Sequence, residues 1–152
     1  MKTTGYWADH YIECKKTARE AMRLIQPGQR VYIGSSSGEP QHLVRALSET
    51  AENLIDIEIV RLMAYESTPL TLIANKSGDQ ALNIRSFYAG SAKPGGLARN
   101  QRFITPLNLS AVPRLFESRR LPIHVALIQV SPPDDFGWMS LGVSVDITLS
   151  AA

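Results

Sequence analysis

The stretch Ser131–Asp146, S-P-P-D-D-F-G-W-M-S-L-G-V-S-V-D, determines how the rest of this sequence is interpreted. It follows the aliphatic run Ile123–Val130, which predicts a strand buried on both faces of a parallel sheet. Pro132 and Pro133 end that strand because proline cannot donate a ladder hydrogen bond, and the aspartates and glycine beyond them favour a turn. A buried strand that breaks into such a turn is typical of sites that α/β proteins build at strand C-termini.

The composition is that of one soluble globular domain. The chain has 152 residues, 44% of them hydrophobic and 20% charged, which allows a sizeable core. The net charge of +2 is too small to indicate nucleic acid binding, and no apolar run is long enough to cross a membrane. The single cysteine, Cys14, excludes an internal disulfide and suits a reducing compartment. Because the N-terminus has no apolar signal segment, we expect a cytoplasmic protein without nucleic acid or membrane partners.

Working outward, strands and helices alternate along the sequence. Apolar residues at helical spacing predict a helix over Tyr6–Gln26, with Cys14 on its buried side, and Glu39-Pro40 favours the start of a second helix. The other predicted strands are Arg30–Ile33, Ile55–Leu62, Ile84–Ala89 and Phe103–Leu107, and the other predicted helices are Thr68–Asn75 and Ser110–Arg120, with a turn at Lys76–Asp79. We therefore predict a single three-layer α/β domain over residues 1–152, with a mostly parallel sheet and flanking helices.

The loop after the first predicted strand, Gly34–Gly38 (G-S-S-S-G), allows three interpretations. It fits the G-x-S-x-G pattern of a serine hydrolase, with Ser36 as nucleophile and His124 as base. However, the pattern falls in a serine run, and His124 lies in a predicted buried strand, where a hydrogen-bonded core histidine is expected. Alternatively, backbone N–H groups of the loop and the next helix bind a phosphate, carboxylate or oxyanion, or the loop is simply a tight turn.

Other candidate groups are weaker. The loop Gly90–Arg102 carries three cations, of which Lys93 is nearest the glycine, and could contact an anionic ligand. No metal site is predicted, since the three histidines are far apart in the sequence and Cys14 lies on an apolar stripe. Asp134 and Asp135 are expected to be solvated, and Trp138 to belong to the core or to an interface.

The run L-P-I-H-V-A-L-I-Q-V followed by Ser131–Asp146 closely resembles the acetyl-CoA hydrolase/transferase family, which includes acetate and 4-hydroxybutyrate CoA-transferases. Weaker similarities occur in the expected order at Val31–Gly34 with Glu39-Pro40, at Phe87–Gly90, and at Pro106–Phe116. The resemblance covers the whole chain, but only the N-terminal half of the family. His124 stands where the family usually has an acidic residue, and G-S-S-S-G is richer in serine than the family pattern.

The resemblance implies a CoA-transferase-like N-terminal domain in acetate metabolism. The full enzyme would move CoA between carboxylic acids, or to water, through a glutamyl-CoA thioester. Its glutamate would lie in a C-terminal half outside this chain, so we expect no catalytic residue here and no activity from the chain alone. Ala152 ends what looks like a continuing element, which fits a piece of a longer protein.

The same resemblance implies the ligands and partners. These are coenzyme A as a substrate, acyl-CoA, a small carboxylate, the C-terminal domain and further copies in a homo-oligomer, with no metal. The residues expected to line the acyl and CoA cleft are Gly34, Ser35, Ser36, Ser37, Gly38, Glu39, Pro40, Ser140, Leu141, Gly142 and Ser144, with Lys93 as a candidate anion contact. Two alternatives stay open: a stand-alone module that binds a CoA-like or sugar-phosphate anion, and a serine hydrolase that uses Ser36.

Overall fold

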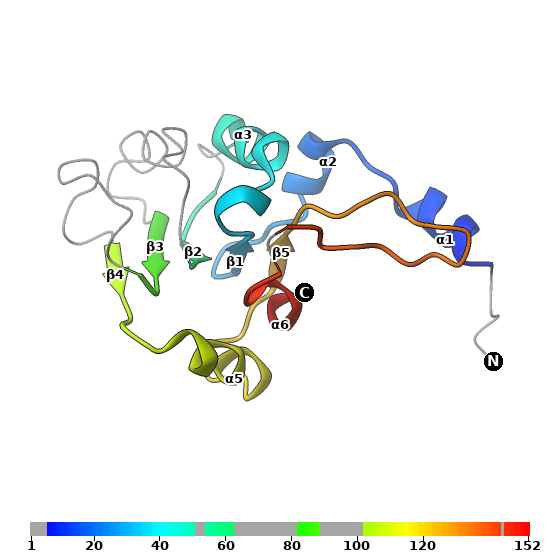
Figure 1. Ribbon diagram of the computed structural model, residues 1–152. Coiled ribbons are helices and arrows are strands. Elements are labelled where there is room, and N and C mark those ends of the chain that lie inside the picture. Colours follow the sequence, from blue (N-terminus) through cyan, green and yellow to red (C-terminus); the bar gives the residue numbers. More distant parts are fainter. Residues whose placement is uncertain (1–5, 51–53, 63–81, 89–101, 144) are drawn as a thin grey trace.

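A computed structural model of the protein describes residues 6–50, 54–62, 82–88, 102–143 and 145–152. These residues form a five-stranded parallel sheet in the spatial order β4-β3-β2-β1-β5, flanked by helices (Figure 1). The strands are β1 (Arg30–Ile33), β2 (Ile57–Arg61), β3 (Leu82–Ser86), β4 (Arg102–Ile104) and β5 (Val125–Leu127). The helices are α1 (Trp7–Cys14), α2 (Ala18–Met22), α3 (Gln41–Thr50), α5 (Val112–Glu117) and α6 (Thr148–Ala151), with 3₁₀ turns η1 (Ser36–Gly38) and η4 (Leu109–Ala111). The predicted α/β class with a mostly parallel sheet is confirmed.

The strand β1 contributes side chains to both halves of the hydrophobic core. Val31 and Ile33 pack in the half that contains residues of α2 and α3, whereas Tyr32 packs in the half that contains residues of α5 and α6. Successive residues of a strand point to opposite faces of a sheet, so three neighbouring side chains serve two separate layers. All three are at most 1% exposed, which places β1 at the centre of the fold.

The single helix predicted over residues 6–26 is wrong, because the chain forms two helices, α1 and α2. A capping box starts the second one: the Thr17 N–H donates to the Glu20 carboxylate at 2.8 Å, and Glu20 N–H donates to Thr17 Oγ1 at 3.3 Å. Hydrogen bonds from the Thr17 side chain and backbone hold the pKa of the Glu20 carboxyl below its usual value. As a result α1 has no buried residue, and Cys14, predicted on a buried stripe, is exposed.

The predicted strand over residues 123–130 is reduced to the three residues of β5, at the edge of the described sheet. β5 pairs with β1 on one side, in the register Val31↔Val125, so its residues are only partly buried except for Leu127. Both faces of β5 are packed as expected, Val125 and Leu127 in one half of the core and Ala126 in the other, but burial is incomplete because a strand at a sheet edge has a neighbouring strand on one side only. The helix predicted over 110–120 is present as η4 and α5, with Pro113 in its first turn as expected, whereas Thr68–Asn75 and Lys76–Asp79 lie outside the described residues.

A carboxylate bridges three adjacent strands on the Tyr32 side of the sheet, near the amino ends of β1 and β2. Glu58 on β2 accepts hydrogen bonds from Arg30 Nε on β1 and from Arg85 Nε on β3, each at 2.5 Å. Arg85 also donates to Thr105 Oγ1 at 2.9 Å and lies over the Phe103 ring, 5.7 Å from its centroid. The Glu58 side chain is only 15% exposed, so these two guanidinium groups replace most of its hydration.

We therefore expect Glu58→Ala to lower the free energy of unfolding by about 2–3 kcal/mol, because it leaves two partly buried guanidinium groups without their shared acceptor. Urea denaturation measures this change. Glu49→Ala is the matched control, since Glu49 forms a 3.8 Å pair with Arg19 in which both side chains are more than half exposed; it should cost less than about 0.5 kcal/mol. Equal losses for the two variants would contradict the assignment.

Candidate functional site

The strand order reverses direction between β1 and β5. From β1 the sheet is extended in one direction by β2, β3 and β4, whereas β5 is added on the other side of β1. The connection that follows β1 contains α3, which packs on the Val31 side, and α5, which precedes β5, packs on the Tyr32 side. In open parallel sheets such a reversal leaves a crevice at the carboxyl ends of the two strands, which is where ligands bind. The loops after β1 and β5 are therefore the candidate site.

The loop after β1 is a compact turn tied to β5. Gly34 N–H donates to the Leu127 carbonyl at 2.9 Å, and Gly38 N–H donates to the Ser35 carbonyl at 3.0 Å. A Cβ on Gly34 would lie 3.0 Å from the Gly38 carbonyl oxygen, so the loop needs a glycine to fold back this closely. Within the loop Ser37 is exposed, whereas Ser35, Glu39 and Pro40 are buried.

Two buried charged groups lie close in sequence to the carboxyl ends of β1 and β2. Glu39 follows η1, and its Oε1 accepts a hydrogen bond from Gln41 Nε2 at 3.1 Å. Arg61 is the last residue of β2 and is also buried. Both groups have interaction partners, as buried charges require. Glu39 was among the cleft residues expected from the sequence, whereas Arg61 was not. Arg61 ends an otherwise aliphatic strand, and that position could have indicated a buried charged residue at the strand end.

A hydrogen-bond network, buried at Tyr32 and Thr148 and exposed at Asp146, connects β1 to the C-terminal residues. The Tyr32 hydroxyl lies 2.9 Å from Thr148 Oγ1, and Thr148 Oγ1 donates to Asp146 Oδ1 at 3.1 Å. Asp146 Oδ1 also accepts from the backbone N–H of Ile147 at 2.5 Å and of Thr148 at 3.1 Å. This network holds the start of α6 against β1 below the candidate site, and nothing in the local sequence around Tyr32 indicated it.

Next to this network lies a buried hydroxyl that makes no hydrogen bond of ordinary length and angle. It belongs to Ser35, which is 1% exposed. It is near enough to Tyr32 to lower the pKa of that phenol somewhat, but the geometry between the two groups is not that of a hydrogen bond. Ser35 therefore lies inside the loop and does not present its hydroxyl to solvent.

Burial raises the pKa of the Tyr32 phenol above its ordinary value of 10.0, and the hydrogen bond to Thr148 offsets only part of this effect. The unfolded chain then loses the phenol proton at lower pH than the folded chain, so stability is unaffected below about pH 10 and falls as pH rises through the folded pKa. We expect Tyr32→Phe to cost about 1 kcal/mol near neutral pH and to reduce this alkaline loss. Urea denaturation at about pH 8 and about pH 11 measures both effects. Tyr88→Phe, at an exposed tyrosine, should keep the wild-type pH dependence.

Beyond β5 the chain extends away from the sheet as an arm, which we define as residues 129–143 and 145–146 (Figure 1). Ser131 N–H donates to the Ser140 carbonyl at 2.8 Å, and Ser140 N–H donates to Ser131 Oγ at 2.9 Å. At the turn, Asp134 Oδ1 accepts from the N–H groups of Phe136 and Trp138, each at 2.9 Å. The arm therefore has a defined conformation that its own side chains stabilise.

The predicted cleft residues of the arm are placed differently from those of the β1 loop. Ser140 pairs with Ser131 inside the arm, and Gly142 N–H donates to Ser140 Oγ at 3.0 Å. Leu141 is half-buried, Gly142 is exposed, and Ser144 lies outside the described residues. The arm starts after β5 and leads away from the sheet (Figure 1).

Helix α1 packs on the tip of the arm through Trp7. A Cβ on Gly137 would lie 2.8 Å from the Trp7 ring, and Gly137 has φ +83°. We expect Gly137→Ala to separate α1 from the arm and to speed amide hydrogen exchange across α1 several-fold. Gly142→Ala is the matched control, because Gly142 has φ +67° but no atom within 4 Å of a built Cβ. Similar exchange in α1 for the two variants would contradict this packing.

The structure does not support the serine hydrolase. His124 Nδ1 accepts from the Arg30 N–H at 3.0 Å, at the amino end of β1, whereas Ser36 follows the carboxyl end of that strand. A four-residue strand spans roughly 13 Å, which is far beyond hydrogen-bond reach. His124 is also exposed, because β5 is an edge strand, and the expectation of a core histidine was wrong although its ring is hydrogen-bonded.

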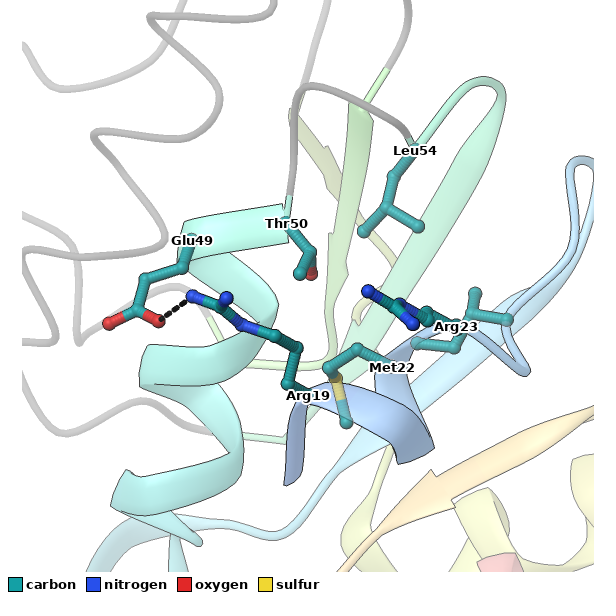
Figure 2. Close-up of a pocket in the computed structure, with 7 residues that line it drawn as sticks. Arg19, Met22, Arg23, Glu49, Thr50 and Leu54 are labelled. Carbon is teal, nitrogen blue, oxygen red and sulfur yellow. Dashed lines mark ion pairs between the residues drawn. The ribbon is translucent and has the colours of Figure 1, made fainter. Parts of the chain in front are cut away.

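A separate hollow of about 520 Å³ lies between α2 and the end of α3 (Figure 2). Figure 2 shows Arg19 reaching toward Glu49 at its rim; the lining residues are Arg19, Met22, Arg23, Ile25, Glu49, Thr50 and Leu54. Leu54 precedes β2, so this hollow is at the amino edge of the sheet, away from the strand ends where the β1 loop lies. It is open, and its apolar floor belongs to the core, so we assign the candidate site to the crevice instead.

The described residues contain no group of three or more His, Cys, Asp or Glu side chains that could hold a metal ion. In the same part of the chain, no helix has the length and apolar character needed to cross a bilayer. Lys93, the candidate anion contact, lies outside the described residues.

The chain belongs to the acetyl-CoA hydrolase/transferase family, because residues 2–152 match the N-terminal domain of that family. It is 37% identical over 147 residues to the 4-hydroxybutyrate coenzyme A transferase of Clostridium kluyveri, covering 96% of this chain and 33% of that protein. It is 28% identical over 134 residues to the succinyl-CoA:acetate/propanoyl-CoA:succinate CoA transferase of Fasciola hepatica, covering 87% of this chain and 27% of that protein. The chain thus spans about a third of the length of these relatives.

Solved structures show the same fold. The 4-hydroxybutyrate CoA-transferase of Porphyromonas gingivalis superposes with a TM-score of 0.72 at 25% identity, covering 95% of this chain and 32% of that one. RipA from Yersinia pestis superposes with a TM-score of 0.74 at 24% identity, covering 93% of this chain and 34% of that one. The resemblance stated from the sequence is confirmed by these comparisons.

Proposed function

We propose that this chain is the N-terminal part of an enzyme that moves CoA between carboxylic acids, or transfers it to water. The match to the family over residues 2–152 is the observation that carries the proposal. The reversal of strand order at β1 and β5 supports it, because open parallel sheets bind ligands at the carboxyl ends of the strands where the order reverses. The proposal includes acyl-CoA and a small carboxylate as substrates, no resident metal, and a cytoplasmic homo-oligomer that acts in acetate metabolism.

In the proposed mechanism a glutamate carboxylate attacks the acyl-CoA carbonyl, which forms an acyl-glutamyl anhydride and releases the CoA thiolate. The thiolate then attacks the glutamyl carbonyl, which gives the glutamyl-CoA thioester and frees the first carboxylate. A second carboxylate reverses these steps to form a new acyl-CoA, or water hydrolyses the thioester and releases CoA as the thiol. Two described glutamates that lie in or next to the sheet, Glu39 and Glu58, are poorly suited to that attack. Glu39 is buried and has interaction partners, and Glu58 bridges two arginines near the amino ends of β1 and β2. We therefore assign the nucleophile to the part of such an enzyme that follows this domain, and we expect the chain alone to be inactive.

The role assigned to this chain is to form one wall of the acyl and CoA cleft. The β1 loop, residues 34–40, and Ser140–Gly142 with Ser144 contribute that wall, and Lys93 remains a proposed anion contact. Ser37 is exposed, so we assign its side chain to substrate contact. The buried residues Ser35 and Glu39 would set the shape of the loop instead.

The test compares the isolated chain with a fused protein, in which this chain is followed by the part of the Clostridium kluyveri relative that lies beyond the matched segment. We expect the isolated chain to release no free thiol from acetyl-CoA above background, and to form no new acyl-CoA when an acceptor carboxylate is added. We expect the fused protein to transfer CoA, and Ser37→Tyr to lower its kcat/KM at least about tenfold by filling the crevice. Ser118→Tyr, at an exposed residue after α5, should have little effect.

Robust turnover by the isolated chain would contradict the assignment of the nucleophile. An active fused protein that tolerates Ser37→Tyr would contradict the place of the β1 loop in the cleft. Calorimetric binding of CoA or a sugar phosphate to the isolated chain, together with an inactive fused protein, would instead favour the stand-alone anion-binding module.

A further inference from the structure

The arm exposes large apolar side chains that contact little of the described chain. Phe136 is 80% exposed, Trp138 76% and Val143 88%. Met139 and Val145 are also exposed, and α1, which packs on the arm through Trp7, adds the exposed Ile12. Single exposed hydrophobic residues are normal, but several on one projecting element mark an interaction surface.

The arm is a formed element and not an unstructured tail. Its two sides are joined by hydrogen bonds between Ser131 and Ser140, and its turn is held by the Asp134 carboxylate. Its far end returns to β1, where Thr148 and Asp146 form the hydrogen-bond network with Tyr32. A partner would therefore meet a preorganised surface and would lose little conformational entropy on binding.

We propose that the arm is the docking surface for the C-terminal two thirds of an acetyl-CoA hydrolase/transferase polypeptide. This rests on the proposed function, in which this chain is the first part of such an enzyme. In the relatives the matched segment is about a third of the polypeptide, so a large remainder is available to cover the arm. The arm also starts at the end of β5, beside the crevice that the remainder must complete.

The size and charge of the arm favour this occupant over a second copy of the chain. Five side chains of this kind offer on the order of 500 Å² of apolar surface, less than the roughly 800 Å² per partner that separate chains usually bury. A covalently joined domain needs less area, because its local concentration is already high. A two-fold contact through the tip would also bring the exposed Asp135 carboxylates of both copies together.

The test measures thermal unfolding of the double variant Phe136→Ser/Trp138→Ser in two contexts. In the isolated chain the midpoint should move by no more than about 1 °C, because both side chains are mostly exposed. In the fused protein described above it should fall by about 4 °C or more, because the same side chains are then buried. Leu24→Ser, at an exposed residue after α2, should have the same small effect in both contexts.

Equal shifts in the two contexts would overturn the proposal. It would also be overturned if sedimentation showed that the isolated chain is a dimer and that the double variant is a monomer, since a second copy would then cover the arm. If the fused protein is insoluble, the two parts are co-expressed as separate chains, and failure to co-purify would count against docking. If the fused protein transfers CoA but its unfolding midpoint is unchanged by the double substitution, only the docking proposal is refuted. If the fused protein is inactive but its midpoint falls as expected, only the proposed function is refuted.

Discussion

The fold depends on β1 having neighbours on all sides. It is hydrogen-bonded to β2 on one edge and to β5 on the other, and its side chains enter both halves of the core. Two contacts near its carboxyl end hold the adjoining segments in place. Gly34 N–H binds the Leu127 carbonyl, and the Tyr32 hydroxyl binds Thr148. The candidate crevice, the start of the arm and the position of α6 all depend on these contacts, because each of them is anchored to this short strand.

The placement of charge in the sheet separates structural groups from candidate functional ones. Glu58 with Arg30 and Arg85 joins three strands near the amino ends of β1 and β2, where a parallel sheet seldom binds ligands. Glu39, after β1, and Arg61, at the carboxyl end of β2, are both buried. The hollow beside α2 also carries charge away from the candidate site. One of its two arginines, Arg19, is already paired with Glu49 at the surface. Charge alone therefore does not indicate the site; its position along the strands does.

The sequence was sufficient to predict the fold class, the family and most strand positions, because hydrophobic runs and turn residues are local signals. It led to the wrong result where a local contact changes the pattern: the Thr17–Glu20 capping box interrupts an apolar stripe that otherwise continues through residues 6–26. The sequence also led us to expect too much burial for β5 and His124. Whether a strand lies at the edge or at the centre of a sheet depends on the order of all the strands, which cannot be inferred from one segment. The pairing of Tyr32 with Thr148, 116 residues later, could not be predicted for the same reason.

The sequence separation of these contacts also bears on how the chain folds during synthesis. β1 is made early, yet its second ladder needs residues 125–127, and its hydroxyl partner is four residues from the last one. Contacts this distant in sequence form slowly, because loop closure must precede them. One edge of β1 and one half of its core thus stay open until residues 125–148 have left the ribosome. This domain should then complete its fold only after β5 has emerged, and shorter ribosome-bound chains should be the species that chaperones must protect.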